Sequence, residues 1–210
     1  MRSADDLTAA ARIRDAAIEQ FGEHGFTVGL RAIAQAAGVS AALVIHHFGS
    51  KDGLRQACDA YVTESIRAAK SESMQNASPA GWLTQLAEIE SFAPLTAYLM
   101  RALRDGGEMA KTLLHNMTEN AESYLEEGVR AGTLRPSRDP KARARYMAIT
   151  NGGGLLLYLQ MHDTPNDLRK VLHDYREEMM LPTLELYTEG LLTDPSFYEA
   201  LLAQHEQEKA

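Results

Sequence analysis

Two adjacent histidines, His46 and His47, are the first residues in this sequence that could carry out chemistry. They lie in a short segment, residues 41–48, that otherwise contains only alanine, leucine, valine, isoleucine and phenylalanine. Imidazole side chains ligate metals, act as bases or make polar contacts from a surface. Neighbouring residues of a helix point about 100° apart, and no cysteine or carboxylate flanks the pair at helical spacing, which disfavours a shared metal ion. We therefore predict polar contacts, with no metal and no cofactor.

The other residues with chemical potential do not form an active site. The triple glycine at 152–154 lacks the preceding strand and the Lys-Ser/Thr pair of a phosphate-binding loop, so it indicates close helix packing instead. Cys58 has no histidine partner in the pattern, and its spacing from neighbouring apolar residues places it in a core. The acidic pairs at 126–127 and 177–178 are typical of solvated helix faces. The sequence predicts a protein that is not an enzyme.

The composition is ordinary for a globular chain, except in how its charge is distributed. Hydrophobic residues make up 45% of the chain and charged residues 24%, and no apolar run reaches the roughly 18 residues that span a bilayer. We therefore predict no membrane partner. A single cysteine allows no internal disulfide, so we predict a cytoplasmic location. Residues 1–70 carry 8 basic and 8 acidic side chains, whereas residues 71–210 carry 13 and 21. The neutral first part could contact phosphates, which would repel the acidic remainder.

Helical periodicity runs through the whole sequence, and the sustained alternation typical of strands does not occur. Ile13, Ala17 and Phe21 recur every four residues and form one apolar face. The residues that would cap following helices are Ser40, Ser50, Ser78 and Asp139. Helices are expected at about 8–24, 30–37, 41–48, 50–71, 80 to 104 with a break at Pro94, 108–131, 139–162, 166–190 and 194–204. This pattern predicts an all-α fold.

The first four helical segments form a specific unit. In the tripeptide Gly-Val-Ser at 38–40, glycine allows a tight turn, valine fills the angle between two short helices and serine caps the second. A second helix of this kind enters the major groove of DNA, and its N-terminal residues reach base edges. The segment resembles the TetR family of transcriptional regulators in its motifs FGEHGF at 21–26, IAQAAGVS at 33–40, and HHF followed by SKDGL at 46–54.

This resemblance implies an architecture and a set of partners. The expected order is an N-terminal three-helix helix-turn-helix DNA-binding domain at 1–50, a long connecting helix at about 50–71, and a helical ligand-binding and dimerisation domain at 72–210. Beyond the connecting helix the similarity is one of architecture only. The implied partners are double-stranded operator DNA, a second copy of the chain and a small hydrophobic effector.

The DNA-binding residues follow from the turn and from the resemblance. On a helix that starts at residue 41, Val44 and Phe48 face inward with Ile33, which leaves the other six residues to solvent or DNA. Leucine or alanine suits a thymine methyl group, and histidine can donate hydrogen bonds to phosphates or base edges. By resemblance, Lys51 corresponds to a phosphate-binding lysine, Ile45 replaces the usual tyrosine, and backbone amides can bind phosphate where the usual threonine is displaced. The expected set is Thr27, Gly29, Arg31, Ser40, Ala41, Ala42, Leu43, Ile45, His46, His47 and Lys51.

The later helices carry the expected effector and dimer residues. Aromatic and methionine side chains suit bulky, varied apolar ligands, and the resemblance implies a cavity for one. The residues expected to line it are Trp82, Phe92, Tyr98, Met100, Leu103, Leu113, Met117 and Tyr124. The last two long helices carry apolar stripes beyond the needs of one subunit, with glycines that would allow a partner to approach closely. The expected interface is Tyr146, Ile149, Gly153, Leu156, Leu159, Leu172, Met179 and Leu186.

Together these features predict a ligand-responsive repressor. A dimer is expected because one short helix contacts too few base pairs for useful specificity, whereas two helices on a two-fold axis bind a palindrome. By resemblance, a multidrug efflux operon is the first expected target, and a lipid or fatty-acid operon responding to an acyl compound is the alternative. A helical interaction protein that does not bind DNA would not explain the turn motif. Release is expected through a tilt of the helix at 50–71, as the only element that belongs to both parts.

Overall fold

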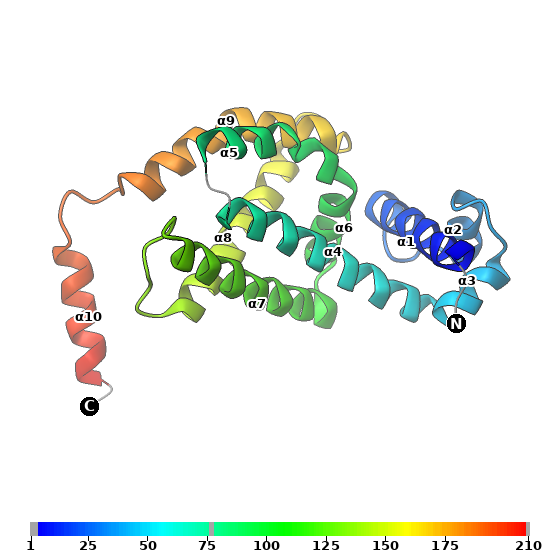
Figure 1. Cartoon of the computed structure of the whole chain (residues 1–210), viewed down its shortest axis with the longest axis horizontal. Helices are drawn as coiled ribbons and strands as arrows, with labels where there is room; N and C mark the ends of the chain where they lie inside the picture. The colour runs from blue at the N-terminus through cyan, green and yellow to red at the C-terminus, as the bar shows by residue number, and fades with distance from the viewer. Residues whose placement is uncertain (1–3, 76–77, 209–210) are drawn as a thin grey trace. The chain divides into compact units, whose positions relative to one another are not determined.

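The computed structural model describes residues 4–75 and 78–208, and its regular elements over these ranges are all helices (Figure 1). The side chains of residues 4–7, 79, 82, 85 and 86 lie outside this description. The elements are α1 (Ala4–His24), α2 (Leu30–Ala36), α3 (Ala41–Phe48), α4 (Lys51–Gln75), α5 (Pro79–Ala87), the 3-10 helix η1 (Ile89–Phe92), α6 (Ala93–Asp105), α7 (Gly107–Ala131), α8 (Pro140–Met161), α9 (Leu168–Thr188) and α10 (Ser196–Glu208). The predicted all-α fold is confirmed.

Serine and glycine set the ends of the short N-terminal helices. The Oγ of Ser40 accepts a hydrogen bond of 3.2 Å from the backbone N–H of Leu43, and the Oγ of Ser50 accepts one of 3.0 Å from Gly53. Gly38 has a φ of 66° in the turn before α3, a conformation that costs glycine little because it has no Cβ. The predicted caps at both serines are therefore confirmed, and they fix where α3 and α4 begin.

The N-terminal helices enclose an apolar core. Fully buried side chains meet there from all four helices: Ile13 and Phe21 from α1, Ile33 from α2, Val44 from α3 and Leu54 from α4. Removing each such side chain from water contributes roughly 1.5–3 kcal/mol to folding. This packing holds α3 by its inner face, so it determines which residues of α3 face outward.

A helix from much later in the sequence completes this core. Tyr98 on α6 is fully buried, with its ring centroid 6.2 Å from that of Phe21 and 5.2 Å from that of Phe26. The helices α1 and α6 approach so closely that a Cβ on Gly22 would lie 2.9 Å from the Cβ of Ala97. The expectation that α4 is the only element shared by the two parts is therefore wrong. Periodicity identified an apolar face on α6 but not the helix against which it packs.

The middle of the chain is divided where proline and glycine occur. Proline lacks a backbone N–H and is tolerated in the first turn of a helix, and Pro94 lies in the first turn of α6 after α5 and η1. Gly132, with a φ of 76°, ends α7. The Oδ1 of Asp139 accepts a 2.9 Å hydrogen bond from the backbone N–H of Ala142 and caps α8. The predicted break at Pro94 and the predicted cap at Asp139 are confirmed.

Two further apolar clusters lie among α6, α7 and α8. The first, called the methionine cluster below, has a buried centre with half-buried neighbours; its members include Leu99, Met100, Ala102, Leu103, Met109, Leu113, Met117, Leu155, Leu156 and Leu159. The second contains Ala121, Leu125 and Ala144. The beginning of α9 lies beside η1, where the Nδ1 of His173 is 3.0 Å from Oε1 of Glu90.

The chain divides into two compact units, residues 1–173 and 174–210, with the boundary inside α9. The first unit contains all three apolar clusters. Packing therefore does not separate residues 1–50 from residues 72 onward, and that boundary stays a prediction about function. The second unit contains the end of α9 and α10. No helix in the described ranges is long and apolar enough to cross a membrane.

Candidate nucleic-acid interface

The outer face of α3 is small and mostly apolar. Ala42, Ile45 and His46 are exposed, and Ile45 is 44% exposed. Ala41 and Leu43 are half-buried because they also pack against the N-terminal core. An exposed isoleucine beside an exposed imidazole offers an apolar contact and a hydrogen-bond donor within one turn. A thymine methyl group and the neighbouring base edges of a major groove have the complementary chemistry.

His47 does not share this outer face. It is only 9% exposed, because it follows the buried Val44 by three residues and so lies on the same side of the helix. Its Nε2 is buried without a hydrogen-bond partner among the described residues. The His46 and His47 rings meet edge to face, with centroids 5.4 Å apart. The prediction that His47 faces outward is wrong, and its contact with DNA stays untested.

Of the remaining predicted DNA-binding residues, Arg31 lies in α2 and Lys51 in α4, and the others lie in the turns between helices. Thr27, Gly29, Arg31 and Ser40 are exposed, whereas Lys51 is half-buried as the first residue of α4. Phosphate contacts need donors or cations at such positions. Asp52 adds a negative charge in the same turn as Lys51, so the cationic contribution of this edge is modest. Contacts of these residues with DNA stay predictions.

Metal chemistry finds no support at these histidines. Within residues 4–75 and 78–208, no group of three or more histidine, cysteine, aspartate or glutamate side chains is placed to hold a metal ion. Cys58 is fully buried, and burial raises the pKa of its thiol to about 12. The Cys58 thiol therefore stays protonated, which agrees with the core position predicted for it.

Tyr98, which was predicted to line an effector cavity, lies in the N-terminal core instead. Its hydroxyl donates a 2.6 Å hydrogen bond to the Oδ1 of Asp59 on α4. Burial, together with this hydrogen bond, raises the pKa of Tyr98, so the phenol stays protonated and acts as a donor. Burial also raises the pKa of Asp59, against the opposing effects of the Tyr98 hydrogen bond and the charge of Arg55. This polar pair connects α6 to α4 at the edge of the core.

The other predicted effector residues lie in several places. Tyr124 packs beside the cluster of Ala121, Leu125 and Ala144. Phe92 is half-buried in η1, and the side chain of Trp82 lies outside the described residues. Four of them do meet, in the methionine cluster: Met100, Leu103, Leu113 and Met117. The expectation of a single cavity lined by all eight is wrong, because helical spacing does not reveal which cluster a helix face joins.

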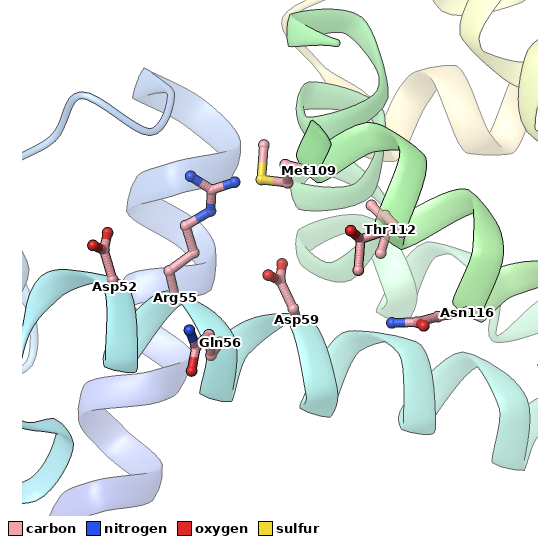
Figure 2. A pocket seen from close by; sticks show the side chains of 8 residues that line it. Asp52, Arg55, Gln56, Asp59, Met109, Thr112 and Asn116 are labelled. Carbon is pink, nitrogen blue, oxygen red and sulfur yellow. The ribbon is translucent and has the colours of Figure 1, made fainter. Parts of the chain in front are cut away.

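A cavity of about 230 Å³ lies between α4 and α7, outside the predicted effector set except for Leu113 (Figure 2). On each helix the lining residues follow the spacing i, i+3, i+4, i+7, which is one helix face. They are Asp52, Arg55, Gln56 and Asp59 on α4, and Met109, Thr112, Leu113 and Asn116 on α7. The polar stripe on α4 was visible in the sequence. It could not be told from a solvated face until α7 was placed opposite it.

The predicted dimer residues on α8 divide into an exposed and a buried group. Tyr146 is 66% exposed, Ile149 is also exposed, and a Cβ on Gly153 would meet no atom within 4 Å. Two residues that were not predicted, Leu157 and Met161, are exposed on the same helix. At helical spacing these five residues form one stripe, called the α8 stripe below.

Three predicted dimer residues are buried or half-buried within the chain. Leu156 and Leu159 pack against the methionine cluster, and Leu172 on α9 is buried. For Leu172 the expectation of an accessible interface is wrong, because the helices of the same chain already cover it. Leu156 and Leu159 are half-buried, and their dimer contacts stay predictions. In the second unit, Met179 and Leu186 are exposed on the last part of α9. Dimer contacts at the exposed positions stay predictions.

Comparison with known proteins agrees with the arrangement of the N-terminal helices. Residues 13–58 match the bacterial regulatory proteins of the tetR family, and residues 90–193 match the C-terminal domain of tetracyclin repressor-like proteins. The whole chain is similar to the HTH-type transcriptional regulatory protein RaaS of Mycobacterium tuberculosis. The two are 66% identical over 210 residues, which is 100% of this chain and 99% of that protein.

Solved structures share the fold at low sequence identity. SmeT, the repressor of the Stenotrophomonas maltophilia multidrug efflux pump SmeDEF, is 24% identical with a TM-score of 0.54, covering 83% of this chain and 89% of that one. The transcriptional regulator FadR of Bacillus subtilis, solved in complex with stearoyl-CoA, is 19% identical with a TM-score of 0.55, covering 87% and 99%. Together with the geometry of the N-terminal helices, these matches show that the chain belongs to the TetR family of transcriptional regulators.

Proposed function

We propose that the protein is a repressor that binds a palindromic operator as a homodimer and leaves it when a small apolar effector binds. The outer face of α3 carries this proposal, because Ala42, Ile45 and His46 are exposed on a helix held rigidly from its inner side. Ile45 can contact a thymine methyl group, and His46 can donate to a base edge or a phosphate.

The proposed dimer follows from the length of α3 and from the α8 stripe. An α3 of eight residues spans too few base pairs for useful specificity, and a two-fold axis doubles the contacts. Tyr146, Ile149, Leu157 and Met161 form an exposed apolar row around the open position at Gly153. A glycine in such a row allows a partner helix to approach closely. These features support an interface between two copies of α8.

The proposed effector site is the methionine cluster. Methionine side chains are flexible and polarizable, so they adapt to apolar ligands of different shape. The Cε of Met117 lies 3.5 Å from where a Cβ on Gly152 would be, so side chains rather than backbone limit the space there. Adaptability of this kind suits a regulator that responds to varied compounds, and we propose a multidrug efflux operon as the target.

Release is proposed to run through α6. Two consecutive residues of this helix serve different clusters, since Tyr98 packs in the N-terminal core and Leu99 in the methionine cluster. An effector that displaces the methionine cluster therefore shifts the helix that also contacts α1. Such an effector changes DNA affinity only as far as its own affinity differs between the DNA-binding conformation and the released conformation. A coupling of about 1–3 kcal/mol, or roughly 5- to 150-fold, is sufficient for induction.

The test is binding to a palindromic fragment from the chain's own promoter region, measured by fluorescence anisotropy. Replacing Ile45 or His46 with alanine is expected to weaken binding by about 1–3 kcal/mol without changing thermal stability. Lys111→Ala removes an exposed charge on α7 and is the matched control, with wild-type affinity expected. Wild-type binding by both α3 variants would contradict the proposal.

The same assay identifies the effector class. Tetraphenylphosphonium, a lipophilic cation, is expected to release the protein from DNA, and operator DNA must then weaken tetraphenylphosphonium binding by the same factor. Release by a long-chain acyl compound and not by the cation would favour the lipid or fatty-acid operon instead. Effector affinities that are identical with and without operator would exclude the proposed coupling.

A further inference from the structure

The cavity between α4 and α7 differs in chemistry from the methionine cluster. Its α4 side carries two carboxylates, Asp52 and Asp59, and one guanidinium, Arg55. Its α7 side carries two apolar side chains, Met109 and Leu113. Amide and hydroxyl groups from both helices complete the lining. Figure 2 shows Asp59 projecting from α4 toward α7, between Arg55 and Thr112.

The charged groups of this lining are not paired with each other. The guanidinium of Arg55 lies over the ring of Phe26, 4.5 Å from its centroid. Among the described residues, Arg55 has no carboxylate within 4 Å. Asp59 uses its Oδ1 to accept the hydrogen bond from Tyr98, and no described side chain donates to its Oδ2. A half-buried carboxylate therefore keeps one oxygen for a ligand.

The cavity is too small for a bulky effector. Drug-sized ligands occupy roughly 300–1,000 Å³, whereas this cavity offers about 230 Å³. That volume equals about seven or eight waters at roughly 30 Å³ each. A compound of about ten non-hydrogen atoms fits, with one polar end and a short apolar body. The net charge of the lining, two carboxylates against one guanidinium, favours a positive polar end.

We propose that this cavity is a second ligand site and that it binds a small organic cation with a protonated amine. The ammonium group ion-pairs with the Oδ2 of Asp59, and Asp52 adds negative charge at the rim. The apolar body lies against Met109 and Leu113. The site shares Met109 and Leu113 with the methionine cluster, and the charged and polar side chains of α4 distinguish it from the proposed site of the apolar effector.

Occupancy has a consequence for DNA binding, and this consequence alone rests on the proposed function. The ligand bridges the first two turns of α4 to α7, and α4 follows α3 after only Gly49 and Ser50. A bound cation therefore resists movement of α4 relative to α7. It is expected to change operator affinity several-fold, in the direction set by the conformation in which the cavity is better formed.

The test is calorimetric titration of the full-length protein, without DNA, with phenethylammonium and with its neutral analogue 2-phenylethanol. Phenethylammonium is expected to bind once per chain and at least about tenfold more tightly than the alcohol. Asp59→Asn is expected to abolish this preference, because the amide oxygen still accepts from Tyr98 but carries no charge. Glu72→Gln removes an exposed carboxylate further along α4 and should leave binding unchanged.

A second variant decides the outcome if Asp59→Asn unfolds. Thr112→Phe keeps every charge but fills the cavity from an exposed position on α7, and it should abolish binding of phenethylammonium. Circular dichroism monitors folding of each variant. Binding of amine and alcohol with equal affinity, or wild-type amine binding by Thr112→Phe, would overturn the site. Because no DNA is present, these results stand whether or not the protein is a repressor.

Discussion

The N-terminal core and the methionine cluster share α6 but are built from different side chains. The core is aromatic and aliphatic, and its central residues, including Phe21, Ile33 and Val44, are completely buried. The methionine cluster is centred on a few buried residues and surrounded by half-buried leucines and methionines such as Met109 and Met117. A tightly packed core transmits displacement, whereas flexible side chains accommodate ligands. The difference suits a rigid DNA-binding part joined to an adaptable part.

The largest expected effect comes from truncating each cluster in turn. Phe21→Ala is expected to lower the free energy of unfolding by about 3–5 kcal/mol, because a completely buried aromatic side chain leaves a cavity. Met117→Ala should cost less than half as much, since Met117 is half-buried and flexible neighbours can fill the space. Urea unfolding followed by circular dichroism measures both. Equal losses would show that the two clusters do not differ in rigidity.

A smaller effect separates the two faces of α3. His47→Ala is expected to lower the free energy of unfolding by about 1–2 kcal/mol, because His47 packs on the inner side beside Val44. His46→Ala should leave stability unchanged, since His46 is exposed, and should weaken only DNA binding. Urea unfolding and operator titration of both variants test this. If His47→Ala left stability intact, the buried position of His47 would not contribute to the packing of α3.

The smallest expected effect concerns the Asp59 carboxyl where the two regions join. Its pKa is raised in the folded state by burial, so the folded protein binds this proton more tightly than the unfolded chain does. Its contribution to the free energy of unfolding is present below the ordinary aspartate pKa of about 3.9 and is lost as pH rises through the folded pKa. Wild-type stability relative to Asp59→Asn should therefore fall from acid to neutral pH.

The matched control for this pH series is Asp105→Asn, which alters an exposed carboxyl at the end of α6. Thermal unfolding from below the ordinary aspartate pKa of about 3.9 up to neutral pH compares the stability of the two variants with that of the wild type. If the stability of the wild type relative to Asp59→Asn rises with pH instead, the Tyr98 hydrogen bond and the charge of Arg55 lower the pKa of Asp59 more than burial raises it. Asp59 would then favour folding as a carboxylate.

Local features of the sequence predicted most of the secondary structure. Ser40, Ser50 and Asp139 cap helices as expected, because each cap uses a side chain and a backbone N–H three residues apart. Gly132 ends α7 for an equally local reason, its left-handed backbone. The turn at 38–40 and the motifs around it were enough to indicate the family. These interactions lie within one helical turn, so composition and spacing suffice to find them.

The predicted sites were less accurate, for a physical reason that His47 and Tyr98 illustrate. His47 has polar chemistry typical of a DNA-contacting residue, but the orientation of α3 in the core turns it inward. Tyr98 was assigned to an effector cavity, but α6 carries it into the N-terminal core. A helix pattern shows that one face is apolar; it does not show which helix covers that face.

The sequence by itself determined the presence of the helices, the caps at Ser40, Ser50 and Asp139, the turn that presents α3 and the membership of the TetR family. The tertiary structure decided which faces meet: α6 against α1, Leu156 and Leu159 against the methionine cluster, and α4 opposite α7 around a polar cavity. The hydrogen bond from Tyr98 to Asp59 joins residues 39 positions apart. Such contacts depend on how complete helices pack side chain against side chain, and that packing is a property of the assembled bundle rather than of any local segment.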